Sequence, residues 1–336
     1  MRDIQRSGDA PLPGEDGGGV HSAAADLPTS ARDAGEKASG FDGFLLGGIG
    51  VFVFGLTLPM THLALDGFDP VTVGLGRAVV AGVIAALVLA ACRVPRPSRP
   101  QIVSLAIVSA GVVIGFPLLA TVAMVYVPAG HGGIVIAILP LTTAAAAVVF
   151  AGERPSIGFW VCAIAGSAAV AAFSVIEGFA LGDASAADLL LIGATICASI
   201  GYAQGAVLAR DLGGWQVICW ALVIAQPILV PAVWLFGAPM TLDGLAAIPA
   251  HAWAGFIYIA LGSQFLAFFA WNAGLARGGV ARVGQLQLLQ TFVTLAGAAL
   301  LLGEELTVFH LGFALLVVAI VAIGKRMAVA RPAARR

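Results

Sequence analysis

The chain has 336 residues, of which 60% are hydrophobic and 10% are charged, and its mean hydropathy is +1.00. A soluble domain is typically about 45–50% apolar and about 25% charged, so this composition excludes a water-soluble fold. It also excludes intrinsic disorder for most of the chain, because disorder requires low hydrophobicity and high charge. The net charge of −1 offers no field that would attract nucleic acid.

Apolar runs separated by proline, glycine and charged residues predict an all-α integral membrane protein with ten transmembrane helices. Residues 1–40 are rich in Gly, Ala, Asp and Ser and predict a disordered cytoplasmic tail, whereas 326–336 predict a short basic cytoplasmic tail. The predicted spans in chain order are 43–65, 70–92, 101–123, 126–149, 156–176, 187–208, 215–237, 250–272, 280–302 and 306–325.

The distribution of basic residues predicts the orientation. With ten spans and a cytoplasmic N-terminus, 16 of the 17 Lys and Arg residues fall in the tails or in loops on one side, and the exception is Arg77 inside the second span. Lys and Arg in short loops stay cytoplasmic. The pattern therefore predicts a multi-pass protein of the cell (inner) membrane with both termini in the cytoplasm.

A repeat relates the two halves of the chain. The junction AVVFAGERPSIGFW (147–160) corresponds to AALLLGEELTVFHL (298–311), about 151 residues later. This divides the chain into a first repeat, 43–176, and a second, 187–325. Because each repeat has five helices, an odd number, the two repeats must have opposite orientations in the membrane. Inverted repeats of this kind are typical of secondary transporters.

These patterns resemble the drug/metabolite transporter superfamily, specifically EamA-type ten-helix transporters, over about residues 43–325. The residues that carry the resemblance are Asp69-Pro70, Arg77, PAGHGGIVIAILP (128–140), GER (152–154), GSQFLAFFAWNAGLARGGVARVGQLQLLQ (262–290) and GEE (303–305). The resemblance implies export of a small metabolite, such as an amino acid or a related compound.

The repeat also defines a structural motif at Pro140, Gly152, Glu153, Gly303 and Glu304. Both glutamates are predicted to start their own helices, where the helix dipole favours a carboxylate. Thr291 stands where the repeat and the family lead one to expect a second proline, 13 residues before Glu304. The ninth helix is therefore expected to be straighter than the fourth.

Polar side chains within the spans are the candidates for a substrate site, because they are costly in hydrocarbon and face the interior or a water-filled cavity. Arg77 lies some seven residues from the outer end of its span, roughly 10 Å deep at about 1.5 Å per residue. It is suited to hold an anionic group such as a carboxylate. The alternatives are extension of the side chain to the outer interface or pairing with backbone carbonyls.

Three further groups of candidates were identified. Gln287, Gln290 and Thr291 share one face of the ninth predicted helix with Thr294, which suits either a cavity wall or interhelical hydrogen bonds. Tyr258 and Trp271, on the eighth span with Ser263, Gln264 and Asn272, suit a pocket or, for Trp271, an interfacial anchor. The remaining candidates are Tyr202 and Gln204 on the sixth span and His131, which could carry protons or be structural.

Taken together, these features predict a secondary transporter, an exporter or exchanger, that moves a small, amino-acid-like metabolite by alternating access. No cofactor or metal is expected, since no phosphate loop or metal-ligand spacing is present. The expected partners are the substrate and the lipid bilayer, and a homodimer is left open. The alternatives are a passive channel and a membrane-embedded enzyme, which the scattered histidines disfavour; the protein is expected not to be an enzyme.

Overall fold

The computed structural model describes residues 29–176, 186–238, 241–303, 308–324 and 326–330, and these segments are almost entirely helical. The chain divides into two units, Met1–Ala38 and Ser39–Arg336. The elements of the first half are α1 (Thr29–Gly55), α2 (Thr57–Leu65), η1 (Thr72–Gly76), α3 (Arg77–Ala91), α4 (Arg99–Val108), η2 (Ser109–Gly115), α5 (Phe116–Met124), α6 (Ala129–Val135), η3 (Ile136–Ile138), α7 (Leu139–Ala151), β1 (Arg154–Pro155) and α8 (Ile157–Ile176).

In the second half, as in the first, short irregular segments interrupt the helices. Its elements are α9 (Ala186–Leu212), α10 (Gly214–Phe236), α11 (Leu242–Ala247), α12 (Ala250–Ile257), η4 (Tyr258–Leu266), α13 (Ala267–Gly278), α14 (Val280–Gly284), η5 (Gln285–Leu289), α15 (Gln290–Leu302), α16 (Val308–Gly324) and β2 (Val329–Ala330). The segments η1, η2 and η4 are π-helical, whereas η3 and η5 are 3₁₀-helical.

The predicted spans can be compared with these helices. Among the described residues, seven stretches are long and apolar enough to cross a membrane: Phe41–Leu65, Thr72–Ala91, Arg99–Met124, Ala186–Leu212, Gly214–Phe236, Ala250–Gly278 and Val280–Leu302. Three shorter apolar helices, Ile136–Ala151, Ile157–Ala169 and Leu315–Gly324, fall on the fourth, fifth and tenth predicted spans. The protein is thus an all-α membrane protein, and α11 is an additional short helix that the hydropathy pattern did not predict.

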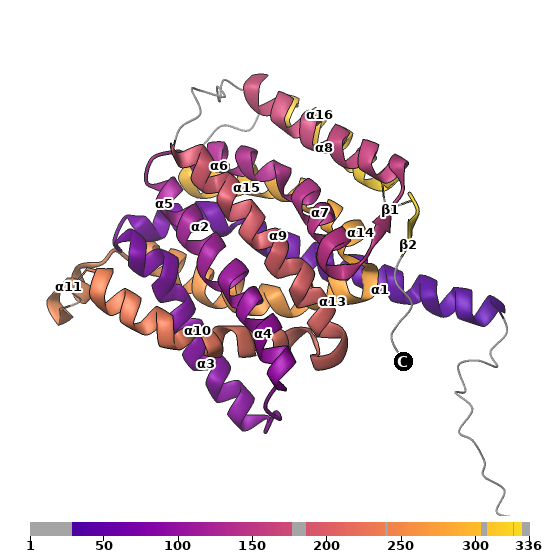
Figure 1. Cartoon of the computed structure of the whole chain (residues 1–336). Helices are drawn as coiled ribbons and strands as arrows, with labels where there is room; N and C mark the ends of the chain where they lie inside the picture. Colours follow the sequence, from indigo (N-terminus) through magenta and orange to yellow (C-terminus); the bar gives the residue numbers. More distant parts are fainter. Residues whose placement is uncertain (1–28, 177–185, 239–240, 304–307, 325, 331–336) are drawn as a thin grey trace, which may run out of the picture. The chain divides into compact units, whose positions relative to one another are not determined.

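Both predicted tails contain secondary structure. Helix α1 begins at Thr29, inside the predicted disordered segment, where Ala, Glu and Lys are good helix formers. Near the C-terminus, β2 pairs antiparallel with β1, Val329 opposite Pro155. Figure 1 shows this strand pair beside α8 and α16, which lie side by side.

The repeat is visible in the backbone. Helices α7 and α15 both follow a 3₁₀ segment, and each ends at a glycine with positive φ, Gly152 at 65° and Gly303 at 78°. These glycines are 151 residues apart and close the helices in the left-handed conformation that favours glycine. The π-helical segments η2 and η4 also occupy corresponding positions. Equivalent sequences in the two halves therefore form equivalent local structures.

The ninth predicted span contains an irregular segment although it lacks the proline of the fourth. The 3₁₀ segment η5 spans Gln285–Leu289, whereas η3 before Pro140 spans only Ile136–Ile138. A proline loosens a helix by removing an amide donor, but contacts with the other half are present at the second site. Thr143 Oγ1 donates to Gln287 Oε1 at 3.1 Å, and Thr291 Oγ1 donates to the Gly133 carbonyl at 3.2 Å. Tertiary hydrogen bonds thus accompany an interruption that contains no proline.

Asp69 caps the helix that leads to Arg77. Its carboxylate accepts the backbone amides of Val71 and Thr72 at 3.0 and 3.1 Å, and the Thr72 hydroxyl at 2.5 Å. Burial alone would raise the pKa of the Asp69 carboxyl, but these hydrogen bonds, with one from the Ala238 amide, lower it below its usual value. The cap fixes the start of the helical run that places Arg77.

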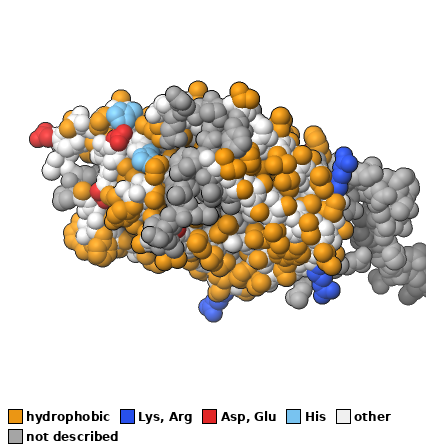
Figure 2. All heavy atoms as spheres, turned by 90° about the horizontal axis from the view of Figure 1, so that it is seen from above, with side chains coloured by type: hydrophobic (Ala, Val, Ile, Leu, Met, Phe, Trp, Pro, Cys, Tyr) orange, Lys and Arg blue, Asp and Glu red, His pale blue; other side chains and the backbone are white. Residues whose placement is uncertain are grey.

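Charged side chains are separated on the surface. In the face shown in Figure 2, hydrophobic side chains cover the middle, and acidic and histidine side chains gather toward the left end. Lys and Arg side chains lie at the right end and along the lower edge. Hydrophobic side chains such as Leu87, Val149 and Leu300 are more than 60% exposed, as expected for a surface in contact with lipid.

Candidate functional site

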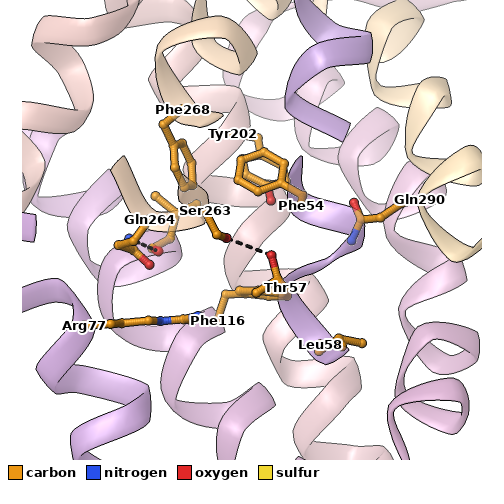
Figure 3. A pocket seen from close by; sticks show the side chains of 11 residues that line it. Phe54, Thr57, Leu58, Arg77, Phe116, Tyr202, Ser263, Gln264, Phe268 and Gln290 are labelled. Atoms are coloured by element: carbon orange, nitrogen blue, oxygen red, sulfur yellow. Dashed lines mark hydrogen bonds between the residues drawn. The ribbon is translucent and has the colours of Figure 1, made fainter. Parts of the chain in front are cut away.

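A pocket lies where six helical runs meet. Its lining combines one cation, several amides and hydroxyls, and a set of aromatic rings: Phe54, Thr57, Leu58, Arg77, Val112, Phe116, Tyr202, Ser263, Gln264, Phe268 and Gln290. Figure 3 shows Arg77 beside Phe116 on one side of this space and Gln290 on the other. The lining contains no Asp or Glu, so the pocket carries a net positive charge.

Arg77 is the unusual member of this lining. Its side chain is only 2% exposed, and its Nε has no hydrogen-bond partner. Within the described part of the chain no ion pair or hydrogen bond joins the guanidinium to another residue, although it interacts electrostatically with Tyr202. A buried charge without a partner is strongly unfavourable. An anionic ligand would supply the missing partner.

Aromatic rings form one wall of the pocket and a second layer behind it. Phe54 and Phe268 pack edge to face with centroids 5.0 Å apart, and Tyr202 lies 6.3 Å from Phe54. Trp271 is fully buried behind them, with its ring 5.3 Å from Tyr202 and 6.0 Å from Phe54. The burial of Trp271 excludes the interfacial role that its sequence position allowed.

The helices are irregular at the level of the pocket. Arg77 directly follows η1, Ser263 and Gln264 lie within η4, and Gln290 directly follows η5. Val112 lies within η2, and α1 ends two residues before Thr57. Such π and 3₁₀ segments break the regular ladder of backbone hydrogen bonds and often occur at functional sites. The backbone is therefore able to bend where the pocket-lining side chains attach.

Side chains from neighbouring helices bind carbonyl groups near these irregular segments. Gln264 Nε2 donates to the Val112 carbonyl at 3.1 Å, and Thr294 Oγ1 donates to the Gly55 carbonyl at 2.7 Å. Thr57 and Ser263 share a hydrogen bond of 2.7 Å across the pocket (Figure 3). These bonds hold the pocket walls together and leave Arg77 and Gln290 without hydrogen-bond partners in the described structure.

Only some of the predicted site residues line the pocket in the structure. Arg77, Tyr202 and Gln290 line the pocket together, and Trp271 supports it from behind. Tyr258 donates its hydroxyl to the Val53 carbonyl at 2.9 Å, outside the lining. Gln287 and Thr291 bond to the other half, as described above. Pro140 is the second residue of α7, after the 3₁₀ turn, and is buried.

Three predicted residues lie elsewhere or outside the described part. Gln204 is half-buried on α9 and is not part of the lining. The side chain of His131 and the whole of Glu304 fall outside the described residues. Within the described residues, no group of three or more His, Cys, Asp and Glu side chains could hold a metal ion.

Several lining residues were not among the predicted site residues. Ser263 and Gln264 were noted only as polar positions on the eighth span, although a glutamine in mid-span is itself a signal of function. Thr57 and the rings of Phe54, Phe116 and Phe268 gave no such signal, because apolar and small polar side chains are common in membrane helices. Their role depends on which helices meet.

Gln290 and Gln287 form a natural pair for mutagenesis because they lie one helical turn apart. Gln290→Leu is expected to raise the KM for transport several-fold, since this amide lines the pocket. Gln287→Leu is expected to leave the KM unchanged and to lower stability by about 0.6 kcal/mol, the typical value of an interhelical hydrogen bond in a membrane. Initial rates in proteoliposomes and thermal unfolding in detergent measure the two effects, and equal KM values for both variants would contradict the assignment.

Comparison with known proteins gives two matches to one family model. The model described as "EamA-like transporter family" matches residues 42–175 and again 185–324. A solved crystal structure that is 17% identical covers 85% of this chain and 99% of that chain with a TM-score of 0.68, which shows the same fold.

Three curated proteins are similar in sequence. The Bacillus subtilis protein "Uncharacterized transporter YdeK" is 42% identical over 84% of this chain and 94% of its own length. The "Probable terminal-alkyne amino-acid exporter" of Streptantibioticus cattleyicolor is 29% identical over 76% of this chain and 83% of its own. The "Probable amino-acid metabolite efflux pump" of Salmonella typhimurium is 35% identical over 31% of this chain and 35% of its own.

Proposed function

The chain belongs to the EamA-like transporter family of the drug/metabolite transporter superfamily, and from this premise we propose that it is a secondary transporter that exports or exchanges a small carboxylate metabolite by alternating access. The main observation behind this proposal is the buried guanidinium of Arg77, which has no ion pair in the described structure and lines the central pocket. A substrate carboxylate would satisfy it through charge-assisted hydrogen bonds.

The substrate is amino-acid-like in this proposal. Two similar proteins have names that refer to export of amino acids or their metabolites. The aromatic wall of Phe54, Tyr202 and Phe268 suits an apolar side chain, and the uncharged amides of Gln264 and Gln290 suit the polar groups of the same molecule.

The architecture in this proposal has ten membrane helices in two inverted five-helix repeats, in the cell membrane, with both termini in the cytoplasm. The double match of the family model and the corresponding backbone irregularities of the halves support the repeat. The separation of Lys and Arg from acidic side chains supports the orientation. The irregular helices at the pocket would serve as the hinges of alternating access.

Counterflow tests this function. Purified full-length protein in proteoliposomes, preloaded with one unlabelled amino acid, is offered the same compound in labelled form, and a panel of amino acids and apolar carboxylates is compared. We expect saturable uptake that is stimulated by internal substrate for at least one apolar carboxylate. Flux that rises linearly with concentration and ignores internal substrate would identify a passive channel instead.

A further inference from the structure

The carboxylate of Glu153 joins the two halves of the chain at one end of the molecule. Its side chain is fully buried, and its two oxygens accept the backbone amides of Val280 and Ala281, each at 2.8 Å. These residues begin the helical run Val280–Leu302 in the second half. The sequence predicts that Glu153 starts its own helix, but α8 begins only at Ile157, so that prediction is wrong. Glu153 instead caps the N-terminus of a distant helix.

The local backbone explains why the carboxylate reaches across. Gly152 ends α7 in the left-handed conformation, which turns the chain away from the helix axis. The receiving helix α14 is preceded by Gly279, whose φ is 94° and which has no side chain to cap the free amides. The negative charge of Glu153 therefore meets the positive end of a helix that lacks a cap of its own.

The same end is closed by close helix packing. The Cβ position of Gly274 on α13 would lie 2.7 Å from the Gly47 amide of α1, so the two backbones are in contact. Val283 on α14 is fully buried, and its side chain fills the space next to Gly47 and Gly278. The beginning of α14 thus lies against the α1–α13 contact, and the Cβ position of Gly47 would also lie 3.9 Å from the Trp271 ring. Displacement of α14 would loosen this packing.

We propose that Glu153 is the latch of the cytoplasmic gate: its two hydrogen bonds to Val280 and Ala281 hold this end closed, and they must break for the transporter to open toward the cytoplasm. Glu153 is a positioning residue, since it lies outside the pocket lining. These hydrogen bonds are suited to a reversible gate. When they break, the carboxylate and both amides form hydrogen bonds with water instead, so the free-energy difference between the closed and open states stays small. The proposal rests on the alternating access proposed above.

Thiol accessibility tests the latch. In the full-length chain, with Cys92, Cys162, Cys197 and Cys219 replaced by serine or alanine, Val283→Cys is the reporter, and its labelling by a water-soluble maleimide is timed in membranes that expose the cytoplasmic side. Adding Glu153→Gln is expected to raise the labelling rate about tenfold, because a neutral amide offers one oxygen for two donors. Asp211→Asn, which removes an exposed charge at the end of α9, is the matched control and is expected to change nothing.

A second variant separates the hydrogen bonds from the charge. Val280→Pro removes one of the two donors and keeps Glu153, and proline is well tolerated at the first position of a helix. We expect an intermediate rate, about threefold above the reporter alone. If folded Glu153→Gln and Val280→Pro proteins both label at the Asp211→Asn rate, the latch is refuted; if Glu153→Gln does not fold, Val280→Pro decides.

Labelling needs no substrate, so it is independent of the transport assay. Faster labelling in the latch variants without counterflow in the parent protein would overturn the proposed transport function and keep the gate. Normal counterflow with unchanged labelling would overturn the latch and keep the transport function.

Discussion

Arg77→Met is expected to abolish carboxylate transport and at the same time to raise the stability of the substrate-free protein. Hydrogen bonds to charged groups contribute about 1.5–3 kcal/mol each, and tenfold in affinity corresponds to about 1.4 kcal/mol. Loss of the guanidinium should therefore weaken substrate binding about 100-fold or more. The buried cation is unpaired in the described structure, so its replacement by an apolar chain should raise the unfolding free energy by about 1 kcal/mol or more.

Substrate analogues make this test specific. Wild-type protein should prefer a free carboxylic acid over its methyl ester, and Arg77→Met should lose that preference because the discriminating charge is gone. Arg77→Lys should retain part of the preference, since lysine supplies a point charge without the planar pair of donors. Arg96→Met, in an exposed loop, is the control. An Arg77→Met protein that still prefers the acid would exclude Arg77 as the anchor.

Gly274→Ala is expected to produce a large loss of stability, because the glycine lies at the close α1–α13 contact. Its added carbon would lie 2.7 Å from the Gly47 amide and 2.9 Å from the Gly43 carbonyl. Both neighbours are backbone atoms, so the two helices must move apart. Overpacking of this kind typically costs about 1–3 kcal/mol, which exceeds the gain in helix propensity of about 1 kcal/mol from glycine to alanine.

Gly48→Ala provides the matched control on the other side of α1. No atom lies within 4 Å of its Cβ position, so only the gain in helix propensity remains and stability should hold or rise. Thermal unfolding of both variants in the same detergent measures the difference. Equal melting temperatures for the two variants would contradict the close contact of α1 and α13.

The candidate site was predicted in part. The helical spacing of Gln287 and Gln290 predicts that they share one side of their helix, but it carries no information on depth. The two side chains lie one turn apart; Gln287 meets Thr143, and Gln290 reaches the pocket. Spacing determines the direction of a side chain, whereas a cavity depends on where neighbouring helices diverge.

The helix that Glu153 caps was also not predictable from the sequence. The sequence indicated a carboxylate near a helix N-terminus, and the nearest helix in the chain was the natural partner. In the structure the carboxylate accepts hydrogen bonds from the amides of Val280 and Ala281, which are 127 and 128 residues away. Which helix end a carboxylate caps depends on the path of the chain after the left-handed turn at Gly152, and this path is set by packing between the halves.

The sequence by itself determined the class of protein, the positions of the apolar helices, the separation of charge and the internal repeat. These properties are local, because the transfer of an apolar segment into hydrocarbon and the closure of a helix at glycine depend on neighbouring residues. Only the tertiary structure decided which buried polar groups are satisfied. Tyr258, Thr291 and Thr294 find carbonyls on distant helices, whereas Arg77 finds none in the described structure, because hydrogen-bond partners are fixed by the packing of segments far apart in the chain.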